Sequence, residues 1–302
     1  MTVNIDTAQI GEKFYKLGGL NTASATPQEE YNGYVRISLK RPHLYLHQLP
    51  EFQKLKHDLP IALAGGGPSI KKCVAELHKH KTVVACGSSH DWLIEQGIEP
   101  RYCVIADPDP KITPLYLKRP CPNTTYLIAT QCPEEVFKAV EGYPIVMWHC
   151  HGEGYKELLD EAQPNWQAVG GGCTAGLRAL SIVIMLGYRN THMFGFDSSL
   201  GWEDEHHAYA FQTETEELGV IYNLKKGFGT PGERTYRCAG YHLAQAQHFK
   251  DFWTAYAGLF TPTFHGEGLL PDMGRAVQAE SIRLAEVETA RIKDLEEKEL
   301  VA

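Results

Sequence analysis

Five short apolar runs in the first half of the chain constrain its fold more than any other feature. They occupy residues 61–64, 82–86, 102–106, 125–129 and 145–148. Helical patterns separate several of them, at residues 69–79, 91–96 and 133–140. Strands that are apolar throughout are typical of a parallel sheet covered by helices on both faces. The sequence therefore predicts a Rossmann-like α/β fold, with a mostly parallel sheet and helices on both faces.

The same alternation continues into the second half of the chain. We expect helices at residues 173–186 and 240–256, and strands at residues 192–196 and 261–265. Residues 198–238 are polar and aromatic without a clear period. A connection of that length is usually functional.

The two ends of the chain fall outside this pattern. We interpret residues 1–57 as an N-terminal extension or lid, with loops at 18–19 and 22–27 and a short strand at 34–39. Residues 58–270 form the Rossmann-like domain, and residues 271–302 a charged C-terminal helix. A weak apolar stripe on this helix predicts packing on the domain or on a second subunit, which would make a homo-oligomer. The stripe consists of Val277, Ile282, Leu284 and Val287.

Composition limits where the chain works and what it binds. The net charge of −8 argues against a nucleic-acid binder, whose footprint is usually basic. The 8 cysteines form no C-x-x-C pair, so we expect free thiols, mostly buried, in a reducing compartment. No signal peptide is visible at the N-terminus, and the apolar run at 177–186 is too short to span a bilayer. A cytoplasmic protein without a membrane span is the expectation.

A glycine-rich turn follows the first apolar run, at residues 65–69 (GGGPS). Ligands of parallel sheets bind at the carboxyl ends of strands, and free N–H groups at a helix start attract phosphate. Gly65, Gly66 and Gly67 would let the backbone approach a phosphate closely, and Ser69 could both cap the helix and contact a phosphate oxygen. An ordinary tight strand-to-helix turn is the alternative. The turn matches neither a Walker A loop nor G-x-G-x-x-G, so nothing favours NAD binding.

A second glycine turn, at residues 170–174 (GGGCT), also precedes a helix. Two such turns in one parallel-sheet pattern favour an anion site. We expect Gly171, Gly172 and Thr174 to contact phosphate there, together with Ser88 after the second apolar run.

Acidic residues and histidines also follow predicted strands. Asp107 and Asp109 could hold Mg²⁺ or a ribose hydroxyl, or simply cap a proline-stiffened turn. Asp197 precedes the run at 203–209 (EDEHHAY), which suggests a metal or general-base site but lacks a known ligand spacing and could equally be a solvated loop. His207, and later His242 and His265, are candidate general bases, although a structural role is common for any single histidine.

Taken together, these motifs resemble the MptE-like family. The resemblance rests on residues 61–69, 97–108 and 171–197 and covers about residues 58–210. Archaeal members of that family are 6-hydroxymethyl-7,8-dihydropterin diphosphokinases, and motility accessory factors of flagellin glycosylation share the domain. The resemblance implies a nucleotide-dependent transferase.

The domain also resembles bacterial CMP-sialic-acid-dependent sialyltransferases. Their Gly-x-Gly-Pro-Ser turn is matched by residues 65–69, their Gly-x-Asp strand end by residues 195–197, and their Tyr-Ala-Phe run by residues 209–211. The resemblance implies that Tyr209 holds nucleotide phosphates and that a histidine before a later helix, matched by His242, acts as base. An asparagine of that glycine turn is replaced here by Gly66, which puts cytidine specificity in doubt.

Three functions remain open at this point. Diphosphate transfer from ATP to a hydroxymethyl acceptor such as a pterin would use Mg²⁺ on Asp107 and Asp109, and the Asp107-Pro108 turn favours it slightly. Glycosyl transfer from a nucleotide-sugar to a small-molecule or glycan acceptor would use His242, His207 or Asp197 as catalytic groups and needs no metal. The third is a nucleotide-binding module without catalysis.

Overall fold

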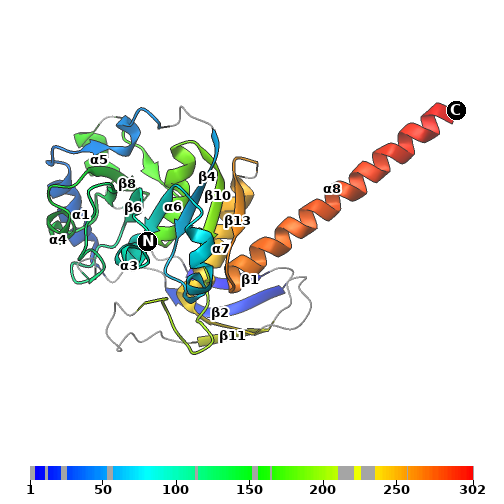
Figure 1. Cartoon of the computed structure of the whole chain (residues 1–302), viewed down its shortest axis with the longest axis horizontal. Helices are drawn as coiled ribbons and strands as arrows, with labels where there is room; N and C mark the ends of the chain where they lie inside the picture. Colours follow the sequence, from blue (N-terminus) through cyan, green and yellow to red (C-terminus); the bar gives the residue numbers. More distant parts are fainter. Residues whose placement is uncertain are drawn as a thin grey trace.

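The computed structural model describes residues 4–10, 13–21, 26–52, 57–112, 115–151, 156–163, 165–209, 221–225, 235–256 and 258–301. Its centre is a parallel sheet with the strand order β13-β10-β4-β5-β6-β7-β8-β3, and β9 pairs with β8 (Figure 1). The strands are β3 (Leu44–Tyr45), β4 (His57–Ala64), β5 (Val83–Cys86), β6 (Tyr102–Ile105), β7 (Thr125–Ala129), β8 (Ile145–Cys150), β9 (Ala168–Val169), β10 (Tyr188–Phe194) and β13 (Thr261–Phe264). The predicted Rossmann-like α/β fold is confirmed.

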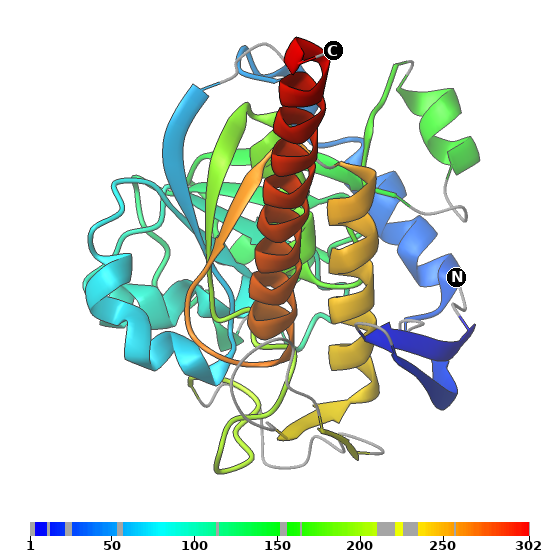
Figure 2. The same ribbon diagram turned by 90° about the vertical axis from the view of Figure 1, so that its right-hand side faces the viewer.

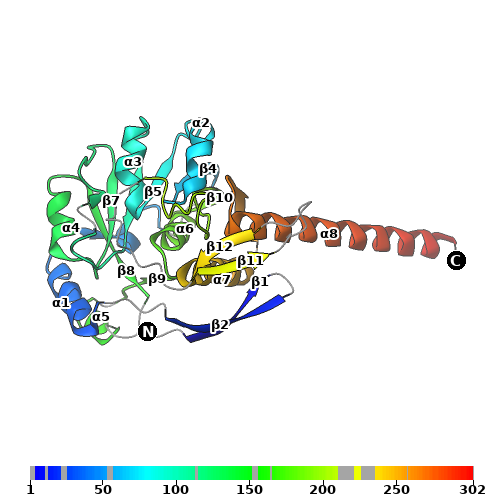
Figure 3. The ribbon, with the colours of Figure 1, turned by 90° about the horizontal axis from the view of Figure 1, so that it is seen from below.

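Helices cover both faces of this sheet. They are α1 (Gln28–Ser38), α2 (Val74–Leu77), α3 (His90–Glu95), α4 (Glu134–Ala139), α5 (Lys156–Ala162), α6 (Ala175–Met185) and α7 (Gly240–Ala255). Figure 3 shows α2 and α3 on one side of the sheet and α6 and α7 on the other. The central strands are buried on both faces, as Ile61, Leu63 and Val84 with no exposed surface illustrate.

Helix α6 packs on the middle of the sheet and forms part of the hydrophobic core. Leu177, Leu180 and Ile182 on this helix are fully buried, and the helix contacts β4, β5, β6 and β10. Thr174 caps its start, accepting a hydrogen bond from the Leu177 N–H at 3.3 Å. This capped start faces the carboxyl ends of the strands, so the central helix also helps to build the site described below.

Two expectations for the N-terminal 57 residues are wrong. Residues 34–39 were expected as a strand, but they lie mostly in α1, where Val35 and Leu159 of α5 bury each other. Their alternation of apolar and polar residues also fits one face of a helix, and Pro27 at the N-cap starts that helix. Residues 18–19 were expected as a loop, but they lie within β2 (Lys13–Asn21), which pairs with β1 (Asn4–Ile10) and lies against α7.

The predicted connection at 198–238 includes a second small sheet. Strands β11 (Ile221–Lys225) and β12 (Thr235–Ala239) form an antiparallel pair, and β12 leads directly into α7. The predicted loop at 22–25, and residues 210–211 of the Tyr-Ala-Phe match, lie outside the described residues.

The C-terminal helix α8 (Leu269–Val301) begins against the domain and then leaves it (Figures 1 and 3). Figure 2 is viewed from the side to which this helix extends, so the helix lies in front of the domain there. Leu269, Leu270 and Met273 are buried against the core. From Val277 onward the described side chains are exposed except for Gln278, which donates a hydrogen bond to the Pro262 carbonyl at 2.6 Å. The exposed residues include all four of the predicted apolar stripe. The stripe therefore does not pack on its own domain, and a role in oligomerisation stays a prediction. None of the helices that the structure describes has the length and apolar character required to cross a bilayer.

Candidate functional site

A cavity of about 260 Å³ opens at the carboxyl edge of the sheet. Its walls come from the turns after β4, β5, β6 and β10 and from the first turns of α6 and α7. The described lining residues are Gly65, Gly66, Gly67, Cys86, Gly87, Ser88, Ala106, Asp107, Ile112, Tyr116, Thr174, Ala175, Gly176, Gly195, Phe196, Asp197, Ser198, Ser199, His206, His207, Tyr241, His242 and Gln245. Parallel sheets place ligands at this edge.

Glycines at the first turn allow two backbone segments to cross. The N–H groups of Gly65 and Gly67 donate to the carbonyl oxygens of Phe194 and Gly195, both at 2.8 Å. A Cβ on Gly65 would lie 2.5 Å from the Gly195 oxygen. Two of the amides expected to bind phosphate are therefore used to join the ends of β4 and β10.

Asp197 holds the same turn in place through its side chain. Its carboxylate accepts hydrogen bonds from the Ser69 N–H at 2.8 Å and from the Ser69 hydroxyl at 2.6 Å, and it is 5% exposed. Ser69 does not line the 260 Å³ cavity. The structure thus gives Ser69 and Asp197 a shared positioning role, where we had expected a phosphate contact and a catalytic group.

Gly66 is the residue of this turn that remains available to a ligand. Its carbonyl accepts a hydrogen bond from the Ala208 N–H at 2.9 Å, while its own N–H has no protein acceptor among the described residues. A Cβ here would lie 2.6 Å from the His207 ring and 2.7 Å from the Tyr209 hydroxyl. The open amide and the His207 ring therefore lie side by side at the cavity wall.

The second glycine turn contributes only its last residue. Thr174 lines the cavity, and its hydroxyl oxygen accepts from the Gln245 side chain at 3.3 Å. Gly171 and Gly172 do not line the cavity. Both have positive φ, and a Cβ on either would collide with Leu177. Their glycine character is explained by close packing on α6, so the expected phosphate contacts at these two positions receive no support.

Ser88 and Tyr209 form one pair, with their hydroxyl oxygens 2.7 Å apart. Ser88 lines the cavity and Tyr209 does not. Burial raises the pKa of Tyr209 well above its ordinary value, so its hydroxyl remains protonated. Tyr209 thus helps to hold Ser88 in place, and its expected phosphate contact stays a prediction.

His242 lies in the first turn of α7 and lines the cavity. Its Nδ1 accepts a hydrogen bond from the Ala239 N–H at 3.1 Å. Burial, together with His206 and His207 nearby, lowers its pKa to about 3, so the ring is neutral at neutral pH. Because Nδ1 is an acceptor, the proton of the neutral ring lies on Nε2. In this arrangement His242 is a hydrogen-bond donor, whereas the sequence suggested a base.

His206 and His207 form the other half of the histidine cluster. Their ring centroids are 4.0 Å apart, and both rings line the cavity. The Tyr241 hydroxyl is hydrogen-bonded to Nε2 of His206. His207 lies against Gly66. Of the histidines that line the cavity, His207 thus remains the best-placed candidate base.

The two predicted metal ligands have different positions. Asp107 lines the cavity, and its carboxylate accepts the Asp109 N–H at 2.9 Å. Asp109 does not line the cavity, and its carboxylate accepts the Lys111 N–H at 2.8 Å. Each carboxylate therefore stabilises a turn, as the alternative interpretation of this motif had it. Asp107 alone could reach a metal ion in the cavity.

Some lining residues carried no readable sequence signal. Tyr241 and Gln245 line the cavity from α7. Gln245 reaches Thr174 at the start of α6, and Ser198 donates a hydrogen bond to the Gln245 side chain at 2.9 Å. The first turns of α6 and α7 meet at this point. Helix starts carry partial positive charge and free N–H groups, so the arrangement suits an anionic ligand.

A second cavity of about 400 Å³ adjoins the first and shares Asp197 and Ser199 with it. Trp202, at its wall, is 74% exposed. The described lining residues are Pro68, Ser69, Lys71, Lys72, Asp197, Ser199, Leu200, Gly201, Trp202, Glu203, Glu205, Thr235, Tyr236, Arg237, Glu267 and Gly268. Two cavities that share a wall suit a reaction between two bound molecules.

The family described as 6-hydroxymethylpterin diphosphokinase MptE-like matches residues 41–203, more than half of the chain. The chain belongs to this MptE-like family. The matched residues include the turns after β4, β5, β6 and β10 that line the cavity, and membership supports a transferase-type role. No curated protein matches the chain.

Solved structures show where else this fold occurs. The MAf glycosyltransferase from Magnetospirillum magneticum AMB-1 aligns with a TM-score of 0.59 and 14% identity, covering 82% of the MptE-like chain. The chain spans only 38% of that protein's length. A mammalian sialyltransferase in complex with Gal-beta-1-3GalNAc-ortho-nitrophenol aligns at 8% identity over 81% of this chain and 88% of its own, with a TM-score of 0.38 that is too low to support an inference.

Proposed function

We propose that this chain is a transferase that holds the phosphates of a nucleotide-sugar in the 260 Å³ cavity and passes the sugar to an acceptor in the adjoining cavity. The observation that carries the proposal is the convergence on one cavity of two helix starts, the open Gly66 amide and three histidines. Such donors stabilise the charge of a leaving phosphate.

Each side chain has a definite task in this proposal. The Gly66 N–H, the Thr174 hydroxyl and the Nε2–H of His242 donate to phosphate oxygens. His207 takes the proton from the acceptor hydroxyl as its oxygen bonds to the anomeric carbon. The bond between that carbon and the phosphate oxygen breaks, and its electron pair leaves with the nucleotide.

The adjoining cavity has the chemistry of an acceptor site for a glycan. The exposed indole of Trp202 offers an apolar face on which a sugar ring can stack. Carboxylates and Arg237 around it offer hydrogen-bond partners for hydroxyl groups. Asp197 and Ser199 lie between the two cavities, so donor and acceptor would meet there.

Diphosphate transfer from ATP remains a second candidate, because the family description names it and Asp107 lines the cavity. That reaction needs Mg²⁺ to neutralise the triphosphate. Apart from Asp197, which already accepts two hydrogen bonds from Ser69, Asp107 is the one carboxylate among the described lining residues. A cavity with three histidines and so few available carboxylates favours the metal-independent reaction.

Thermal denaturation with nucleotides distinguishes the two reactions. The proposal predicts that CMP, CDP, UDP or GDP raises the melting temperature in the presence of EDTA. It also predicts that Asp107→Asn leaves this shift intact. Stabilisation by ATP that requires Mg²⁺ and is lost in Asp107→Asn would establish diphosphate transfer instead. If no nucleotide changes the melting temperature, both reactions are excluded and a different ligand occupies the cavity.

A further inference from the structure

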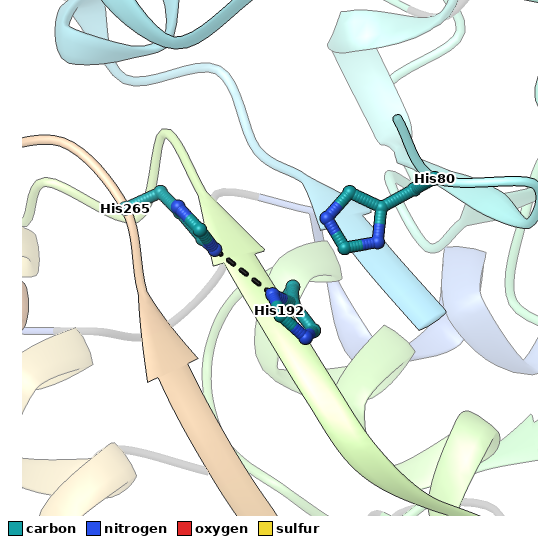
Figure 4. Close-up of side chains that lie close together, drawn as sticks. All are labelled: His80, His192 and His265. Carbon is teal, nitrogen blue, oxygen red and sulfur yellow. Dashed lines mark hydrogen bonds between the residues drawn. The ribbon is translucent and has the colours of Figure 1, made fainter. Parts of the chain in front are cut away.

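Three histidines from distant parts of the chain meet on the sheet, outside both cavities (Figure 4). His80 precedes β5, His192 lies in β10, and His265 directly follows β13. One ring nitrogen from each lies within 4.8 Å of the other two, and Nδ1 of His192 is 2.9 Å from Nε2 of His265. Within the part of the chain that the structure describes, no other group of histidines, cysteines and acids has this geometry.

The rings are held in place by aromatic neighbours. His265 stacks flat on Phe194, with centroids 4.0 Å apart, and His80 meets the same ring edge-on at 5.5 Å. The backbone of His265 is fixed as well, because its N–H donates to the Met193 carbonyl at 2.9 Å. Side chains held this firmly lose little further freedom when they bind an ion.

The electrostatic setting suits a cation. Burial lowers the pKa of all three imidazoles, that of His265 to about 4, so the rings are neutral at neutral pH and each has one nitrogen with a lone pair. Glu76, four residues before His80, acts on all three rings with its negative charge. Lys79 and Arg275 are the cations nearby, and Lys79 is paired with Glu76.

We propose that His80, His192 and His265 form a binding site for a divalent transition metal of the Zn²⁺ type. Three imidazole nitrogens suit Zn²⁺, Co²⁺, Ni²⁺ or Cu²⁺ and do not suit Mg²⁺ or Ca²⁺, which prefer oxygen. Tetrahedral Zn–N bonds of about 2.0–2.1 Å place two ligating nitrogens about 3.4 Å apart. The ring nitrogens lie within 4.8 Å of one another, and those of His192 and His265 are 2.9 Å apart, so metal binding requires the rings to adjust to this spacing. One of the two rings now donates the N–H in the hydrogen bond between His192 and His265. On metal binding, the proton of that ring moves to its other nitrogen, so that both of the hydrogen-bonded nitrogens can bind the metal.

The position of the site indicates a structural role for the metal. The residues after His265 pack behind the anion turn: a Cβ on Gly266 would collide with the Ser69 hydroxyl, and one on Gly268 with the Asp197 backbone. A metal ion bound by all three histidines would join His265 to β10 and to the segment before β5. It would thereby stabilise the segment after His265, which packs against Ser69 and Asp197 of the glycine-rich turn. The metal is separate from the proposed nucleotide chemistry, because none of its ligands lines either cavity.

Cobalt binding tests the site without reference to catalysis. The full chain, purified without a histidine tag and stripped with a chelator, is titrated with Co²⁺, whose visible absorption bands report tetrahedral nitrogen ligation. We expect one Co²⁺ per chain, displacement by Zn²⁺, and a rise in melting temperature that EDTA reverses. Absence of stoichiometric binding overturns the proposal.

Variants assign the ligands. His192→Asn and His265→Asn should weaken Co²⁺ binding by more than roughly 100-fold, because losing a ligand costs more than losing an outer partner. His78→Asn is the matched control, since His78 is exposed and lies two residues before His80. His80→Asn serves as the second variant should a strand substitution impair folding, which circular dichroism reports. Binding that survives in His80→Asn and His192→Asn, or that is lost equally in His78→Asn, contradicts the assignment.

Discussion

At the scale of single residues, the glycine-rich corner shows that one motif serves two purposes. Gly65 and Gly195 are needed because two backbones cross with no room for a Cβ, whereas Gly66 faces the cavity beside His207. Sequence reasoning assigned all three glycines of the turn to phosphate binding. The structural glycines differ from the one open to a ligand in the hydrogen-bond acceptor of each N–H group. Those acceptors lie in and after β10, more than a hundred residues later in the sequence.

Gly65→Ala should destabilise the fold, because the new methyl group would meet the Gly195 carbonyl oxygen at 2.5 Å, and backbone atoms cannot turn away as a side chain can. We expect a loss of about 1–3 kcal/mol in the free energy of unfolding, measured by urea denaturation. Gly33→Ala is the matched control, since a Cβ at Gly33 meets nothing within 4 Å inside α1. It should add about 0.5–1 kcal/mol. Equal stability of the two variants would contradict the crossing described here.

The lowered pKa of His242 makes the free energy of unfolding depend on pH. Its pKa is about 3 in the folded chain and about 6.5 when unfolded, so between these values the unfolded chain binds the extra proton. The stabilising contribution is complete above pH 6.5 and is lost as the pH falls toward 3. In His242→Gln, the free energy of unfolding should fall less steeply on acidification, by about 1.4 kcal/mol per pH unit. Denaturation curves between about pH 7 and pH 5 measure the difference, and parallel slopes for both proteins would refute the buried neutral ring.

At the scale of elements, α8 is divided into an anchored start and an exposed remainder. Asp272 accepts a hydrogen bond from the Tyr236 hydroxyl at 2.6 Å, and Arg275 donates to the Phe264 and Gly266 carbonyls. Beyond this anchor, apolar side chains such as Ile282 and Val287 are 61% and 55% exposed. The first turns therefore belong to the domain, and the exposed apolar side chains between Val277 and Ile292 could meet a partner.

Truncation after residue 279 should test this division. The described side chains that it removes are all exposed, so we expect the free energy of unfolding to change by less than about 0.5 kcal/mol. If the apolar stripe pairs two copies of the chain, sedimentation will show a dimer for the full chain and a monomer for the truncated one. A large loss of stability in the monomeric truncated chain would show that the outer helix packs on the domain after all.

Elements with a strong local signal could be predicted, and those with an ambiguous one could not. The strands at 61–64 and 125–129 are apolar on both faces, which few other structures allow, and α6 has a threonine cap and a glycine stop. Apolar and polar residues alternate at 34–39, but this stretch is too short for the pattern to distinguish a strand from a helix. For the site, the edge of the sheet could be predicted, but the roles of Asp197 and His242 depend on long-range hydrogen bonds that no local pattern carries.

At the scale of the whole molecule, the parallel sheet brings widely separated segments to one edge. Turns after β4 and β10, which are adjacent in the sheet, form the corner, and the starts of α6 and α7 close it. The three-histidine cluster joins the segments that support this corner from outside the cavities. An anion cavity, an adjoining second cavity and a braced turn together suit group transfer from a nucleotide.

Calorimetric titration of the chain with CDP, UDP, GDP and ATP tests the central claim, that the cavity beside Gly66 binds nucleotide phosphates. The account predicts that at least one nucleotide binds the unaltered chain and Gly33→Ala with equal affinity. Gly66→Ala, whose Cβ would displace His207 and Tyr209, should bind it at least about 10-fold more weakly, a loss of about 1.4 kcal/mol. Unchanged affinity in Gly66→Ala, or no binding of any nucleotide to the unaltered chain, would contradict the account.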